Sequence, residues 1–70
     1  DRASAAENYR KAVALAPNHP DANYRLAVLY YLDGAYETAL PYAEKAREYG
    51  ARGAAELIEK IRGKMEASGE

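Results

Sequence analysis

The chain has 70 residues, so it is one small domain or part of a larger protein. It has no cysteine, which excludes disulfide bonds and thiolate metal ligands, and its formal net charge of −1 gives no electrostatic reason to expect nucleic acid as a partner. No apolar run approaches the roughly 18 residues that span a bilayer, and no signal peptide is visible, so we expect a soluble chain without membrane insertion whose compartment is open.

The first predicted helix runs from Asp1 to about Ala16. The Asp1 carboxylate can accept a hydrogen bond from a free backbone N–H of the first turn. Pro17 ends this helix because it has no N–H and disfavours helical geometry in the residue before it. Asn18 and His19 then form a short turn.

The second predicted helix begins at Pro20, where a proline costs no hydrogen bond, and runs to about Leu32 or Asp33. Gly34 supplies the break, in a left-handed conformation. One face of this helix follows the i, i+3, i+4, i+7 spacing of a buried stripe: Asn23, Leu26, Ala27 and Tyr30.

A third helix is predicted from Tyr36, with an apolar stripe of Ala39, Leu40, Ala43 and Ala46; Pro41 lies close enough to its start to be tolerated. Gly50 and Gly53 bracket the next turn. The fourth helix carries an apolar face of Ala54, Leu57, Ile58, Ile61 and Met65. No strand pattern competes, so we predict an all-α fold of about four helices, arranged as stacked antiparallel hairpins.

Residues recur at an offset of 34: Ala5 as Ala39, Lys11 as Lys45, and Ala12 as Ala46. A fixed period of this length is typical of stacked helical units. With its short helices and small contact residues, the chain resembles the tetratricopeptide repeat family. The matching residues include the pair Leu26 and Ala27, the aromatic Tyr30, Gly34 and Tyr36 at the turn, the small residues Ala5, Ala12, Ala39 and Ala46, and the closing Pro17.

The resemblance divides the chain into three parts. Residues 1–19 match the second half of a preceding repeat, residues 20–53 form one full repeat, and residues 54–70 form a C-terminal capping helix and tail. The fourth helix matches the second best at an offset of 35, which places Arg62 where Ala27 allows close helix contact. A charge at that position resists further stacking, which is why we interpret this helix as a cap.

Three positions depart from the family pattern. Asn23 stands where a bulky aromatic residue is common. Ala43 replaces a large residue, so Tyr42 or Tyr49 must fill the space or a void remains. Ala51 replaces the closing proline, and the neighbouring glycines are expected to break the helix instead.

The second helix has a further apolar stripe of Tyr24, Val28 and Tyr31, bordered by Arg25 and Leu32. These five residues are the candidate partner-binding site. Two interpretations stay open. The stripe packs on the fourth helix, or it lines a peptide-binding groove on the concave face, where tyrosines give rigid apolar contact and Arg25 binds a carboxylate or backbone group.

The leading functional prediction is therefore a protein–protein interaction module that binds a peptide or helix of a partner protein. The alternative is a structural role in which the repeats self-associate through residues 5–13, with Ala5, Ala6, Tyr9 and Val13 at the interface. We predict no enzyme activity, cofactor or metal, because the one histidine, His19, is a solvated loop residue without a nucleophile or carboxylate at catalytic spacing. Nucleic-acid binding is not expected, since it would require a basic groove and the chain is close to neutral.

Overall fold

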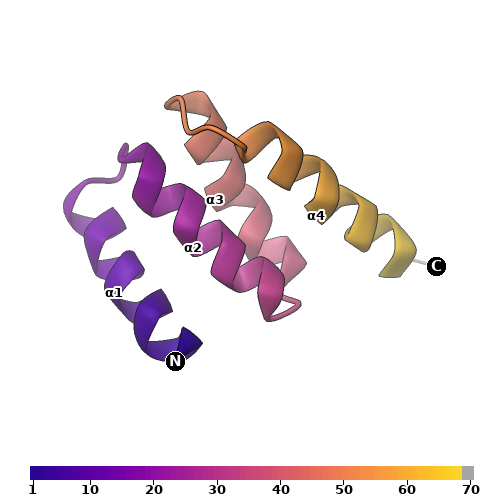
Figure 1. Cartoon of the computed structure of the whole chain (residues 1–70), viewed down its shortest axis with the longest axis horizontal. Helices are drawn as coiled ribbons and strands as arrows, with labels where there is room; N and C mark the ends of the chain where they lie inside the picture. Colours follow the sequence, from indigo (N-terminus) through magenta and orange to yellow (C-terminus); the bar gives the residue numbers. More distant parts are fainter. Residues whose placement is uncertain (69–70) are drawn as a thin grey trace.

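The computed structural model describes residues 1–68, and within them the chain forms four α-helices and no strand. The helices are α1 (Arg2–Leu15), α2 (Pro20–Leu32), α3 (Tyr36–Glu48) and α4 (Ala54–Ser68). The predicted all-α class and the four predicted helices are confirmed (Figure 1). Of the predicted tail, Gly69 and Glu70 lie outside the described residues.

The starts of α1 and α2 are capped by side chains. Asp1 Oδ1 accepts a hydrogen bond from the backbone N–H of Ala3 at 2.9 Å, as predicted for an N-cap. His19 Nδ1 accepts from the backbone N–H of Ala22 at 3.1 Å, directly before Pro20. The interpretation of His19 as a plain loop residue was therefore incomplete, because its ring satisfies a donor that α2 leaves free.

Gly34 has the predicted left-handed backbone, and Gly53 shares this conformation. Gly34 has φ 80° and follows α2, and its N–H donates to the carbonyl of Tyr31 at 3.0 Å. Gly53, which precedes α4, also has φ 80°. A Cβ at Gly53 would lie 3.3 Å from the hydroxyl oxygen of Tyr24, so both the backbone angle and the close side chain favour glycine there.

The helices follow one another across the molecule, with α1 at one edge and α4 at the other (Figure 1). Each helix packs on the next in sequence, and α2 also touches α4. Among the described residues α1 contacts α2 alone. This nested arrangement buries Leu26, Ala27, Ala39 and Ala46 completely, as the stacked-hairpin prediction requires.

Small residues bring the helices of the core close together. Two fully buried alanines of α3, Ala39 and Ala43, belong to one cluster with Leu57, Ile58 and Ile61 of α4. Tyr42 packs against this cluster and stacks on Tyr30 with the ring centroids 5.7 Å apart. Tyr49 stays 38% exposed. Tyr42, rather than Tyr49, therefore occupies the space beside Ala43.

The helix positions reproduce the repeat seen in the sequence. Arg2 and Tyr36, the first residues of α1 and α3, are 34 positions apart. The burial of α2 and α4 agrees at an offset of 35, where the pairs Ala22 and Leu57, Asn23 and Ile58, and Leu26 and Ile61 are all buried. The turn before α4 is one residue longer than the turn before α2, because it spans residues 49–53 rather than 16–19.

The burial and hydrogen bonds of Asn23 account for its departure from the family pattern. Its side chain is fully buried, and its Nδ2 donates to the carbonyl of Pro17 at 3.0 Å and to that of His19 at 2.7 Å. An aromatic ring could not make these bonds. Asn23 thus ties the turn between α1 and α2 to the start of α2.

Candidate partner-binding groove

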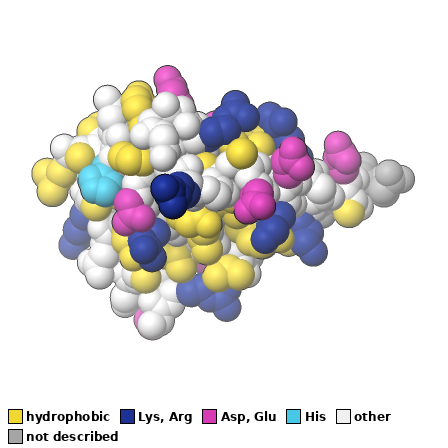
Figure 2. Space-filling model, turned by 45° about the horizontal axis from the view of Figure 1, so that its top comes forward, with side chains coloured by type: hydrophobic (Ala, Val, Ile, Leu, Met, Phe, Trp, Pro, Cys, Tyr) yellow, Lys and Arg dark blue, Asp and Glu magenta, His cyan; other side chains and the backbone are white. Residues whose placement is uncertain are grey.

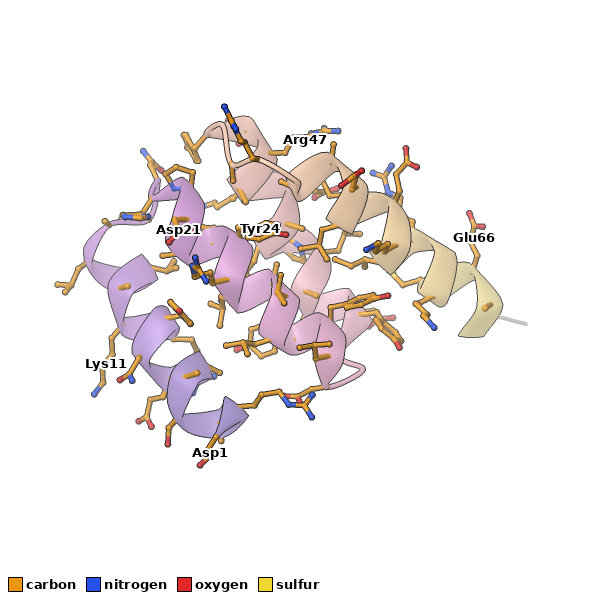
Figure 3. All side chains as sticks on the ribbon, viewed as in Figure 1. Asp1, Lys11, Asp21, Tyr24, Arg47 and Glu66 are labelled. Atoms are coloured by element: carbon orange, nitrogen blue, oxygen red, sulfur yellow. The ribbon has the colours of Figure 1, made fainter. Side chains whose placement is uncertain are left out.

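An open groove runs between α1 and α2 and encloses about 330 Å³. Its lining residues are Ala5 and Tyr9 of α1 and Tyr24, Arg25, Val28 and Leu29 of α2. Figure 3 shows Tyr24 on α2 extending toward the start of α4, with Asp21 one turn before it. On the face shown in Figure 2, charged side chains of both signs are interspersed with hydrophobic ones. The groove therefore offers apolar contact with a polar rim, as small binding sites commonly do.

Two side-chain contacts, one to α2 and one to the residue that follows it, fix the position of α1 at the groove. Arg10 Nη1 donates to the hydroxyl of Tyr30 at 3.0 Å, and this hydrogen bond raises the pKa of Arg10. Arg2 forms an ion pair with Asp33 at 3.1 Å. Ala6 is buried between them, at 6% exposure. These contacts, spread along α1, hold it against α2 and turn Ala5 and Tyr9 toward the groove.

The five residues of the predicted site do not form one continuous surface. Tyr24, Arg25 and Val28 line the groove, whereas Tyr31 and Leu32 are not among its lining residues. Tyr31 packs against Tyr36 of α3, with ring centroids 5.7 Å apart, and Leu32 is 57% exposed.

Tyr24 and Val28 combine the two interpretations that the sequence left open. Both pack against the core cluster, and both also line the groove. The hydroxyl of Tyr24 lies close to Gly53, at the start of α4. The predicted stripe is therefore partly core and partly surface, with its surface part facing α1.

Arg25 supplies charge at the rim of the groove. Its Nε donates to both carboxylate oxygens of Asp21, at 3.0 and 3.2 Å. The hydrogen bond and the charge of Asp21 raise the pKa of Arg25, and Tyr9 adds to this effect. Both members of the pair are more than half exposed, so the pair adds little stability but presents both signs of charge to a ligand.

Three residues of the groove were not predicted as part of this site. Ala5 and Tyr9 were assigned to a separate self-association surface, and Leu29 was not singled out. Their role follows from the packing of α1 on α2, which helical periodicity within one segment does not report. Of the proposed self-association residues, Ala5, Tyr9 and Val13 are half-buried, while Ala6 is covered by α2 and is not available for a second chain.

The described residues show neither a metal-binding cluster nor a membrane-spanning helix. No group of three or more His, Cys, Asp or Glu side chains within them could hold a metal ion. No helix between residues 1 and 68 has the length and apolar character needed to cross a membrane. The groove residues themselves carry aromatic, aliphatic and guanidinium groups, which suit binding rather than metal chemistry.

Comparison with known families gives one match. A family model described as TPR repeat matches residues 3–34, which comprise nearly all of α1, the turn that Asn23 fastens, and all of α2. The matched residues therefore include every residue that lines the groove. No match was found among curated proteins or among solved structures.

Proposed function

We propose that the chain is a protein–protein interaction module whose α1–α2 groove binds a peptide or a helix of a partner protein, starting from the match of residues 3–34 to the tetratricopeptide repeat (TPR). The TPR repeat suggests a scaffold for protein interaction in general, and such repeats are typically not catalytic. The groove formed by Tyr24, Arg25 and Val28 of α2 with Ala5 and Tyr9 of α1 is the observation that carries the finer proposal.

Each wall of the groove has a distinct task in this proposal. Tyr24 and Val28 are held by the core on one side, so they offer apolar surface that loses little conformational freedom when a ligand binds. Arg25 contacts a carboxylate or carbonyl oxygen of the partner from the rim. Leu32, although exposed, lies outside the groove and belongs to the site only if the partner extends past the end of α2.

We also propose the division into a half-repeat (1–19), a full repeat (20–53) and a cap (54–70). Arg62 supports the cap, because its side chain is 58% exposed and pairs with Glu44 at 3.5 Å instead of facing another helix. The outward side of α4 carries exposed charges, including Glu59, Lys60 and Lys64. Such a face is suited to water rather than to a further repeat.

The test is a selection of ligands from a random 16-residue peptide library displayed on phage, followed by affinity measurement with synthetic peptides. We expect Val28→Lys to weaken binding by roughly tenfold or more, because it places a charge in the apolar part of the groove. Ala55→Lys, at an exposed position of α4, is the matched control and should bind as the wild type does. Peptides that bind the Val28→Lys chain with unchanged affinity would place the binding surface elsewhere and refute the proposal.

A further inference from the structure

The turn between α1 and α2 contains a histidine whose ring acts as a hydrogen-bond acceptor. His19 directly precedes α2, and its Nδ1 accepts from the backbone N–H of Ala22 at 3.1 Å. It is the one histidine of the chain, and it is exposed, so protons from solvent can reach the ring. The groove is lined by other residues, so the role of His19 is separate from the groove.

The ring can cap α2 only while it is neutral. A neutral imidazole has one nitrogen that donates and one that accepts, whereas the protonated ring donates from both. Protonation of His19 would place an N–H on Nδ1, opposite the N–H of Ala22, and the hydrogen bond would be lost. The charged ring would also lie at the positive end of the α2 dipole. The capped geometry is therefore compatible with the neutral ring alone.

The backbone of His19 joins the two helices that the turn connects. Its carbonyl accepts from Nδ2 of Asn23 at 2.7 Å and from the Asn23 backbone N–H at 3.2 Å. Its own N–H donates to the carbonyl of Ala16 at 3.0 Å, and Asn23 Nδ2 also donates to the carbonyl of Pro17 at 3.0 Å. We call residues 16–23 the α1–α2 junction. The ring of His19 caps the same turn of α2 from which Asn23 holds this junction together.

Asp21 is the charged residue closest to His19 along the chain. A carboxylate near an imidazole favours the protonated ring, which would oppose the effect of the cap. Both carboxylate oxygens of Asp21, however, accept from Nε of Arg25, at 3.0 and 3.2 Å. Its charge is therefore already paired within α2.

The other elements around the junction bring charges of both signs. These charged residues are all exposed: Lys11 of α1, Lys45, Arg47 and Glu48 in the last turn of α3, Arg52 in the turn that follows, and Glu56 in the first turn of α4. No ion pair among residues 1–68 includes His19. The cap of α2 is therefore the contact of the ring that depends on its protonation.

We propose that His19 makes the α1–α2 junction sensitive to pH, so that mild acid removes the cap of α2 and loosens the attachment of α1. Histidine is the side chain that ordinarily changes its charge between pH 8 and pH 5. The cap stabilises the fold while the ring is neutral, so its contribution is present at the upper end of this range and is lost as the pH falls.

The attachment of α1 makes this effect consequential. Among the described residues α1 contacts α2 alone. Besides the junction, two side-chain contacts hold α1 in place: Arg10 to the hydroxyl of Tyr30, and Arg2 to Asp33. Weakening the junction therefore removes part of a small set of restraints. This inference goes beyond the proposed function, because it concerns the opening of the fold and its test needs no ligand.

Two variants of the full chain separate the cap from the other effects of pH. In His19→Asn the side-chain oxygen can accept from the N–H of Ala22 at either pH, because asparagine is a good N-cap residue and does not titrate. In His19→Ala no side-chain cap forms at either pH. All other titratable groups are the same in the three chains, so a difference between the chains belongs to position 19.

Urea unfolding at about pH 7.5 and at about pH 5 measures the effect on stability. On acidification we expect the folding equilibrium constant of the wild type to fall about fivefold more than that of His19→Asn, which corresponds to the usual contribution of an N-cap. His19→Ala should be less stable than the wild type at the higher pH. At the lower pH it should be at least as stable as the wild type, because neither chain then has a cap.

Amide hydrogen exchange of the native chains locates the effect. At about pH 5, after correction for intrinsic exchange rates, we expect the amides of Ala22 and of α1 to be less protected in the wild type than in His19→Asn. At about pH 7.5 the two chains should protect these amides to the same extent.

Three results would overturn the inference. Equal losses of stability on acidification in the wild type and in His19→Asn would show that protonation of His19 does not matter. A His19→Asn chain that is no more stable than His19→Ala would show that the side chain at position 19 does not cap α2. Equal protection of the α1 amides in the wild type and in His19→Asn at the lower pH would confine the effect to α2 and exclude a loosened α1.

Discussion

The two helices α1 and α3 show how the same sequence pattern can have different structural consequences. Both carry small residues at the same three spacings, except that Tyr9 stands in place of Ala43. On α3 these residues are completely buried because α2 and α4 flank the helix, whereas α1 has α2 as its single neighbour. The number of neighbouring helices, rather than the pattern itself, decides whether such a stripe is core or surface.

A second pair of equivalent positions differs in chemistry instead of exposure. Asn23 and Ile58 are both buried at the offset of 35, yet one is polar and the other aliphatic. Asn23 has two backbone carbonyls within hydrogen-bonding distance in the turn before α2. Exchanging the residues at these positions tests whether each is fitted to its own turn.

The largest effect is expected for Ile58→Asn. This change removes aliphatic contacts from the core cluster and buries an amide where no partner is provided, so we expect a loss of about 4 kcal/mol in the free energy of unfolding. Asn23→Ile loses two hydrogen bonds but gains apolar volume, and about 1–2 kcal/mol is expected. Urea unfolding followed by circular dichroism measures both. Equal losses in the free energy of unfolding would show that Asn23 and Ile58 are not fitted to their own turns.

A smaller but clear contrast is expected between Ala43→Tyr and Tyr9→Ala. At position 43 a ring must enter a fully buried site beside Tyr42, so we expect a loss of about 3 kcal/mol from overpacking. Tyr9 is half-exposed in the groove, and its truncation should cost about 1 kcal/mol or less. Thermal unfolding under identical conditions compares them, and a stable Ala43→Tyr chain would mean that α2 and α3 can separate more readily than their packing indicates.

Effects below those of Ile58→Asn and Ala43→Tyr are expected at two glycines that differ in backbone conformation. Gly53→Ala forces an L-residue to φ 80° and brings its Cβ to 3.3 Å from the Tyr24 hydroxyl, so a loss of about 1–2 kcal/mol is expected. Gly63→Ala meets no atom within 4 Å inside α4 and should raise stability by about 0.5–1 kcal/mol through helix propensity. Chemical denaturation that shows a lower free energy of unfolding for Gly53→Ala and a higher one for Gly63→Ala supports this account. A lower value for both variants would contradict it.

Helix ends could be predicted because they depend on local chemistry. Asp1 caps α1, Pro20 begins α2, and Gly34 ends it as expected. The burial of Leu26 followed from helical spacing alone. Residues whose environment is set within a few positions along the chain can be predicted from the sequence.

The groove could be predicted only in part because its two walls come from different helices. Tyr24 and Val28 were identified on α2, but their partners on α1 could not be found without the contacts that fix the two helices, such as Arg10 to Tyr30. Tyr31 shares a helical face with Tyr24 and yet turns to Tyr36. The periodicity of a single helix shows which residues share a face. It does not show which neighbouring helix each of those residues contacts.

The contact of α1 with α2 alone also shapes how the molecule opens. In a linear row of helices each element is secured by its immediate neighbours, so unfolding can begin at an end without disturbing the middle. Backbone amides of α1 should then exchange with deuterium sooner than those of α2 and α3, which have neighbours on two sides. A ligand that binds to α1 should slow this exchange. The exchange rate of the α1 amides therefore reports whether a ligand is bound.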